Sequence, residues 1–182
     1  MKTKFIEKTI HYDGSQLKAL YSYVHHKTSG NSIVSFRGSC NVTLEHMVDA
    51  EDFVVNAEIK SDNMLHFIVE IFNQDLMAIV SLQRLLVAIA HNILLQKGVK
   101  VLRGGDDLYV DKKKLSVSIA SGSAVSTMIH LGINIENKGT PVPTCALNDF
   151  GLDAKEFSLE LMKDFSLEFN SIVEATQKVK PL

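Results

Sequence analysis

The sequence is poor in cysteine and has no excess of charge of either sign. Its 182 residues include two cysteines, Cys40 and Cys145, which do not form a C-x-x-C pair. This scarcity excludes a disulfide framework, and we expect two free thiols in a cytoplasmic protein. Nineteen basic residues against 21 acidic ones give a net charge of −2. Nucleic-acid binders usually carry a basic face, so this balance argues against a nucleic-acid partner.

Long uninterrupted apolar runs are also missing. The longest candidate, 76–95, contains Gln83, Arg84 and His91, whereas a membrane span needs about 18–20 consecutive apolar residues. We therefore expect a buried helix there and no membrane partner. The first residues are basic, but no apolar core follows them, which argues against a signal peptide. No linker or internal repeat divides the chain, so residues 1–182 are expected to form a single domain.

Hydrophobic periodicity predicts strands through the middle of the chain, with helices between them and after them. Strands are expected over 4–12, 32–36, 53–55, 63–72, 99–102, 108–110, 115–120 and 126–135. Helices are expected over 15–26, 75–97 and 153–179. Consecutive strands at hairpin spacing indicate an α+β fold with a mixed, largely antiparallel sheet flanked by helices.

The densest set of functional signals lies in one short stretch of the chain. It reads R-G-G-D-D-L-Y-V-D-K-K-K-L-S-V-S-I-A over 103–120 and, after a Gly-Ser spacer, T-M-I-H-L-G-I-N-I over 127–135. Paired acids open a strand, a turn follows, and Lys114 stands seven residues after Asp107. A hairpin of this length brings the ammonium and the carboxylate to one edge of a sheet. Such groups can neutralise phosphates and stabilise charge in an acyl-activation step.

This layout resembles the catalytic core of the biotin and lipoate protein ligase superfamily, which has a class II aminoacyl-tRNA synthetase-like fold. There, a K-W-P-N-D-L stretch is followed by a lysine on the next strand and then by a G-I-G-I-N strand. The resemblance follows the order of elements over about 30–150, and its specific motifs lie within 103–134. It implies an uncharacterised branch of the superfamily. Such a protein would handle a small carboxylic acid or its adenylate and transfer an acyl or adenylyl group.

The resemblance also implies a role for individual residues. Lys114 corresponds to the catalytic lysine, which would bind the acyl oxygen or the α-phosphate, and Asp107 corresponds to the motif aspartate. Asp107 and Asp106 would bind metal or orient Lys114, and ATP with Mg²⁺ is the implied cofactor. The other expected site residues would hold anionic groups or line the pocket. They are Arg37, Gly38, Arg103, Gly132 and Asn134.

Several positions depart from the ligase pattern. Asp106 replaces the usual asparagine, Gly104-Gly105 replace Trp-Pro, and Val117 stands where ligases have a glycine. The Gly/Arg-rich loop G-R-G-R-x-G-R is absent, and only Arg37-Gly38 remains at the corresponding place. The loss of that loop leaves two alternatives open, a ligase that uses ATP and a protein that does not.

Octanoyl and lipoyl transferases of the same superfamily use no ATP and offer a second interpretation. They pair a lysine on this hairpin with a cysteine nucleophile in a P-C-G segment that follows an H-G-x-A-L-N strand. Here the segment 129–134 is loosely similar, and Cys145 stands eleven residues after Asn134. A thiol near the Lys114 ammonium would have a lowered pKa, so Cys145 is the candidate nucleophile. A small buried thiol is the structural alternative.

A third interpretation is a non-catalytic small-molecule-binding or assembly protein that has kept the fold, because a fold does not determine its chemistry. Gly-Gly-Asp-Asp is also ordinary turn chemistry, and Lys112 and Lys113 are expected at a solvated hairpin tip. The histidines lack the convergent spacing of metal ligands, so no metal site is predicted. The helix over 76–95 is apolar nearly all round, which indicates a partner subunit and hence a homodimer. An acceptor protein is the other expected partner.

Overall fold

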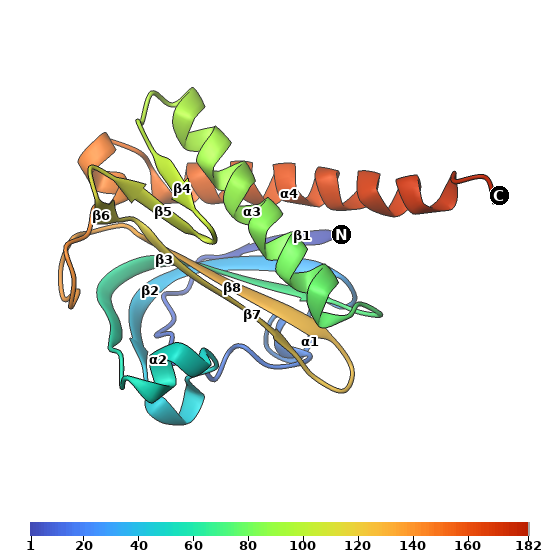
Figure 1. Cartoon of the computed structure of the whole chain (residues 1–182), viewed down its shortest axis with the longest axis horizontal. Coiled ribbons are helices and arrows are strands. Elements are labelled where there is room, and N and C mark those ends of the chain that lie inside the picture. The colour runs from blue at the N-terminus through green and yellow to red at the C-terminus, as the bar shows by residue number, and fades with distance from the viewer. Residues whose placement is uncertain (182) are drawn as a thin grey trace.

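The computed structural model describes residues 1–181. Its strands form two sheets, and helices lie on both sides of the larger one (Figure 1). The strands are β1 (Lys2–Ile6), β2 (Ser32–Val42), β3 (Ile59–Ile71), β4 (Leu102–Gly104), β5 (Asp107–Val110), β6 (Lys113–Lys114), β7 (Ser116–Gly122) and β8 (Thr127–Asn134). The helices are α1 (Tyr21–His26), η1 (Leu44–His46), α2 (Ala50–Val54), α3 (Leu76–Gln96), η2 (Leu147–Phe150) and α4 (Ala154–Gln177), of which η1 and η2 are short 3-10 helices.

Five strands form the main sheet, in the order β1-β2-β3-β8-β7. β1 runs parallel to β2, and all other neighbours in this sheet are antiparallel. The antiparallel strands β4, β5 and β6 form a small second sheet that contacts β7 and α3. The predicted α+β fold, with a mixed, largely antiparallel sheet flanked by helices, is therefore confirmed.

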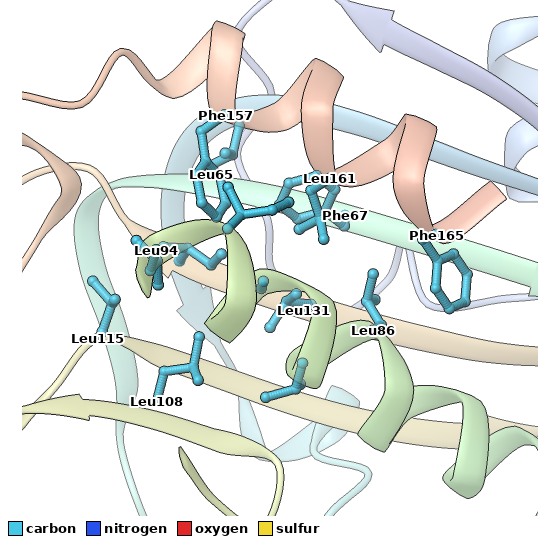
Figure 2. Packing of buried hydrophobic residues seen from close by; sticks show 14 of the residues in the cluster. Leu65, Phe67, Leu86, Leu94, Leu108, Leu115, Leu131, Phe157, Leu161 and Phe165 are labelled. Carbon is cyan, nitrogen blue, oxygen red and sulfur yellow. The ribbon is translucent and has the colours of Figure 1, made fainter. Parts of the chain in front are cut away.

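The two faces of the main sheet are covered in different ways. The long helices α3 and α4 lie across one face (Figure 1), and Figure 2 shows Leu86 of α3 and Leu161 of α4 packing over Phe67 and Leu131 of the sheet. The opposite face carries a smaller core around Phe36 and is covered by irregular chain, α1, η1 and α2. Short elements cover a sheet less completely than long helices, and the pocket described below lies on this second face.

The apolar helix α3 is the one expected from the sequence, and the Asp75 carboxylate caps it by accepting from the backbone N–H of Ala78 at 2.7 Å. By length and composition alone α3 could cross a membrane, yet seven of its side chains are buried in the fold. Its most exposed apolar side chains, Leu76, Met77 and Leu95, lie near its two ends. In this structure α3 therefore packs as a core helix.

The strand predicted at 53–55 is wrong, because Ala50–Val54 form α2. Asp49 caps this helix, and its carboxylate accepts from the backbone N–H groups of Glu51 and Asp52. Val54 is 77% exposed, so its β-branched side chain has no sheet to pack against. Local capping here outweighs the strand preference of the apolar residues.

Several element boundaries also differ from the prediction. The strand expected over 4–12 ends at Ile6, and the strand expected over 99–102 begins only at Leu102. β2 does not end at Phe36 but continues to Val42 with a bulge between Gly38 and Cys40. The helix expected from Ser15 begins only at Tyr21. The Asp13 carboxylate accepts from both the backbone N–H and the hydroxyl of Ser15, which folds this segment into turns rather than helix.

The predicted hairpin around Lys112 exists, but its second strand is short. Asp111 and Lys112 both have positive φ angles, 49° and 65°, as a tight two-residue turn between β5 and β6 requires. β6 ends at Lys114, and the chain then crosses into β7, which pairs with β8 of the main sheet. Lys114 therefore lies at the junction of the two sheets.

Candidate functional site

A pocket of about 390 Å³ lies on the less covered face of the main sheet. Its floor is made by side chains of β3, β7 and β8 and by Tyr12, whose segment crosses this face. The chain between β2 and β3 forms the cover, and the loop 140–144 forms one wall. Asp107 and Lys114 of the small sheet line its mouth, together with Asp106 from the turn between β4 and β5.

Lys114 is held in place by both its backbone and its side chain. Its N–H donates to the carbonyl of Pro143 at 3.1 Å. Its Nζ forms an ion pair with Asp107 Oδ2 at 2.9 Å, and Asp107 Oδ2 also accepts from the Tyr109 hydroxyl at 3.1 Å. The side chains of Lys114 and Asp107 are 31% and 21% exposed, so the ion pair is partly shielded from water. The structure thus brings together the two residues predicted to be catalytic.

Asp106 connects the mouth of the pocket to helix α3. Its carboxylate accepts from Arg84 Nη1 at 2.8 Å and from Gln83 Nε2 at 2.9 Å. Gly105 precedes it with a φ of 67°, and a Cβ at this glycine would collide with the Arg84 guanidinium. In the sequence, Gln83 and Arg84 stand out only as polar interruptions of an apolar helix. Their position on a buried helix was the signal that they had a partner in the fold.

Asn134 and Gly132 lie on the face of β8 that carries the pocket. Asn134 is buried, lines the pocket, and donates from Nδ2 to the carbonyls of Lys114 at 3.4 Å and Cys145 at 3.3 Å. Gly132 pairs with Val117 of β7, and a Cβ there would press against Met64 and Val117, which line the pocket. Asn134 therefore holds the Lys114 segment in position, and Gly132 leaves room for the side chains of the floor.

Tyr12 and His130 line the floor of the pocket and His66 is buried beside His130, and none of these three rings was expected at the site. The rings of Tyr12 and His130 are stacked with their centroids 3.8 Å apart, and His66 Nδ1 lies 3.1 Å from His130 Nε2. Burial lowers the pKa of His66 to about 3 and lowers the pKa of His130 well below its usual value. Both imidazoles are therefore neutral at physiological pH. The two histidines are 64 residues apart, so only the register of β3 against β8 brings them together.

The two arginines expected at the site lie away from the pocket lining. Arg37 lies on the face of β2 that α4 covers, with its guanidinium 5.9 Å from the centre of the Phe5 ring. The exposed Arg103 donates from Nη1 to the carbonyl of Gly105 at 2.7 Å. In this structure, neither arginine is placed to hold an anion inside the pocket.

Gly38 has a structural explanation at the place where sequence analysis expected a ligand contact. A Cβ at this position would collide with the backbone carbonyl of Ile10, because that segment crosses close to β2. The Gly38 carbonyl also lies 3.2 Å from His66 Nε2. Gly38 therefore acts on the pocket indirectly, by positioning the histidine beneath it.

Both cysteines are free and buried. Cys145 packs in the core under the long helices rather than in the pocket lining, and its Sγ lies 3.5 Å from the carbonyl of Lys113. Burial raises the pKa of its thiol, opposite to the lowering expected from the nearby Lys114. The backbone N–H of Cys145 donates to the carbonyl of Lys114 at 3.1 Å, so the two residues are neighbours through the main chain.

Carboxylates outnumber cations around the pocket. Its lining contains Asp49, Asp52, Glu58, Asp106 and Asp107 but only Lys60 and Lys114 as lysines. The pKa of Asp52 is raised by its burial and by Asp49, while Lys114 acts in the opposite direction. Among residues 1–181, no group of three or more His, Cys, Asp or Glu side chains is arranged to hold a metal ion.

Comparisons with known proteins identify close relatives across the whole chain. The family described as "Domain of unknown function (DUF366)" matches residues 1–180. An uncharacterized protein from Methanocaldococcus jannaschii is 36% identical over 189 residues, covering 100% of this chain and 86% of that protein. The solved structure of a protein of unknown function from Pyrococcus horikoshi is 39% identical. It has a TM-score of 0.96 and covers 100% of this chain and 98% of its own.

More distant solved structures share the fold. Biotin protein ligase from Aquifex aeolicus in complex with biotin and ATP has a TM-score of 0.61 at 14% identity, over 95% of this chain and 72% of its own. Lipoate-protein ligase A bound with ATP has a TM-score of 0.62 at 13% identity, over 93% and 86%. At these identities the likeness concerns the fold alone. It confirms the expected fold, that of the biotin and lipoate protein ligases.

Proposed function

This chain belongs to the DUF366 family, and on that premise we propose that its pocket binds a small carboxylic acid or the adenylate of that acid and transfers an acyl or adenylyl group. The observation that carries the proposal is the position of Lys114. Its partly shielded ammonium lies at the mouth of a pocket of about 390 Å³, in a fold shared with biotin and lipoate protein ligases.

The two ends of the pocket suit the two ends of such an acid. Met64, Val117 and Ile119 line the floor and can contact a hydrocarbon body. Lys114 has three N–H donors, so it can bind a carboxylate and keep its ion pair with Asp107. An acid bound in this way places its carboxylate at the open edge, where an activating group or an acceptor protein can reach it.

In an adenylation step, a carboxylate oxygen of the acid attacks the α-phosphorus of ATP, and pyrophosphate leaves. Lys114 would neutralise the charge that develops at the α-phosphoryl group, and Asp107 would orient the ammonium. The use of ATP is supported by the two similar ligase structures that hold it. Because carboxylates predominate around the pocket, ATP would need Mg²⁺ to offset the charge of its phosphates.

The same excess of carboxylates favours a second candidate, a non-catalytic protein that binds the small acid without nucleotide. Arg37 and Arg103, the two arginines expected to hold anionic groups, lie outside the pocket lining. A single carboxylate needs only Lys114, whereas a triphosphate needs several cations. Acyl transfer through Cys145 has less support, because its thiol is buried in the core.

Pyrophosphate release separates the two candidates. The purified protein would be incubated with ATP, Mg²⁺ and one acid at a time, using biotin, lipoate and octanoate. We expect release with one acid for the wild type and for Lys113→Ala, whose exposed side chain is the matched control. Lys114→Ala should abolish release, and Cys145→Ser should retain it. Acid binding with no release for any acid would reject the ligase and support the binding protein.

A further inference from the structure

We propose that the inner end of the pocket recognises a hydrogen-bond donor on the body of the acid, an N–H or O–H of its ring or chain, through Nδ1 of His130. This inference rests on the function proposed above and narrows its substrate class. The acid would carry a polar donor several bonds away from its carboxylate, unlike a simple fatty acid.

The position of the proton on His66 follows from its contact with the backbone. Nε2 of His66 lies 3.2 Å from the carbonyl oxygen of Gly38. A carbonyl oxygen only accepts, so Nε2 must carry the N–H. The ring is fully buried, stacked against Phe36 with centroids 5.2 Å apart, and neutral. A neutral imidazole has a single N–H, so Nδ1 of His66 is an acceptor.

The contact with His66 also fixes the position of the proton on His130. Its Nε2 lies 3.1 Å from His66 Nδ1 and must donate to it. The buried His130 ring is also neutral, which leaves its Nδ1 as an acceptor. Within residues 1–181, the structure gives Nδ1 no hydrogen-bond partner, yet it is not among the unpaired polar atoms that are sealed inside the fold. Because His130 lines the pocket, a ligand can supply the missing donor.

The neighbours of His130 hold this acceptor rigidly. Tyr12 covers the ring with an interplanar angle of 10°, and a ring flip would break the contact with His66. Gly132 leaves room for the ring in this position, because a Cβ there would come within 3.3 Å of His130 Cε1. A fixed acceptor needs no reorganisation on binding, which favours a ligand that presents a donor at the matching position.

The apolar surroundings make the acceptor selective. Met64, Val117 and Ile119 line the same pocket. A purely hydrocarbon ligand would fill it and exclude water from His130 Nδ1, which would leave a buried polar atom unpaired. Sites that are built to bond a polar ligand group discriminate strongly against analogues that lack it. The pocket should therefore prefer donor-bearing acids to fatty acids of the same length.

The tautomers can be measured without any ligand. Long-range ¹H–¹⁵N correlation spectra of the histidine rings should show the proton on Nε2 in both His66 and His130. The exposed His25 serves as a reference for an imidazole in water. A proton on Nδ1 of His130 would overturn the inference, because the pocket would then offer a donor instead of an acceptor.

Calorimetry with matched acids tests the recognition itself. The probes are octanoate against octanoate with a terminal hydroxyl, and lipoate against biotin, whose ring carries N–H donors. We expect the donor-bearing member of at least one pair to bind about tenfold more tightly. In His130→Phe this preference should vanish, while binding still depends on Lys114.

Each contrary outcome has a distinct meaning. Equal or tighter Lys114-dependent binding of octanoate and lipoate would overturn the inference and leave the proposed function standing. Failure of every acid to bind, or binding unaffected by Lys114→Ala, would overturn the proposed function and the inference with it.

Discussion

At the residue scale, the polar groups near the pocket are fixed by specific neighbours, and the histidine pair shows this most clearly. His66 and His130 are stacked in the sheet and hydrogen-bonded to each other, with one further contact to the Gly38 carbonyl. This arrangement holds both rings in the neutral form, in which each has one donor and one acceptor. It therefore couples the stability of the fold to pH.

We predict that acidification destabilises the protein below about pH 6.5, the usual histidine pKa of an unfolded chain. Below that pH the two histidines bind protons in the unfolded chain but stay neutral in the folded protein, because burial lowers their pKa values. Their stabilising contribution is complete above that pH and is lost as pH falls toward the folded pKa, which is about 3 for His66. Urea unfolding at pH 7 and pH 5 should differ by roughly 2 kcal/mol for each histidine. Equal free energies of unfolding at the two pH values would contradict the neutral pair.

A second residue-scale prediction concerns Gly38. Alanine at this position brings its Cβ against the Ile10 carbonyl, and backbone atoms yield less readily than flexible side chains. We expect Gly38→Ala to reduce the free energy of unfolding by about 3 kcal/mol or more. Gly122→Ala is the matched control, because nothing lies within 4 Å of the Cβ it would add. Similar unfolding midpoints for the two variants would show that the segment around Ile10 can move away from Gly38 at little cost, which would contradict this prediction.

Lys114 and Asp107 could be predicted from the sequence because a short hairpin joins them, so local geometry brings them together. Tyr12, His66 and His130 could not be predicted, because their contacts depend on the register of distant strands. The structural reason for Gly38, its close approach to the Ile10 carbonyl, could not be predicted either. A glycine that a crossing segment requires looks the same in sequence as one that approaches a ligand.

At the scale of elements, the small sheet is attached to α3 through Asp106. This carboxylate accepts from Gln83 and Arg84, and Gln83 also donates to Ser118 of β7 at 3.0 Å. The helix, the small sheet and the main sheet therefore meet at one polar cluster. The position of Lys114 relative to the pocket depends on this attachment.

We predict that Asp106→Ala loosens the β4-β5 hairpin more than it destabilises the whole protein. The ion pair with Arg84 is partly exposed, so its loss should cost only about 1 kcal/mol in global stability. Hydrogen exchange should accelerate at the amides of 103–110 and stay unchanged in the middle of α3. Exchange that rises equally throughout the protein would show that Asp106 has no local anchoring role.

The long elements were easier to predict from sequence than the short ones. α3 and α4 have many periodic apolar positions and an aspartate cap each, Asp75 and Asp153, so their signals add over the length of the helix. The segment that became α2 has five residues, and its cap at Asp49 competes with strand-forming side chains. In so short a segment a single capping contact can outweigh the strand preference of the side chains, and the sequence does not show which of the two prevails.

At the scale of the whole molecule, the homodimer predicted from the apolar character of α3 remains to be tested. The sheet and α4 cover much of this helix, but Met77 is 76% exposed and Leu167 of α4 is 59% exposed. The C-terminal half of α4 extends beyond the sheet (Figure 1). We predict a dimer through these apolar surfaces in sedimentation velocity at micromolar concentration, dissociated by Leu167→Glu. A single monomeric species for the wild type would remove the prediction.

The central claim is that Lys114 makes the pocket a receptor for a small carboxylate. Titration calorimetry of biotin, lipoate and octanoate into the wild type, Lys114→Ala and Lys113→Ala tests it most directly. We predict that at least one acid binds the wild type and Lys113→Ala alike and binds Lys114→Ala at least about tenfold more weakly. Equal affinity of Lys114→Ala and Lys113→Ala, or no binding to the wild type, would contradict it.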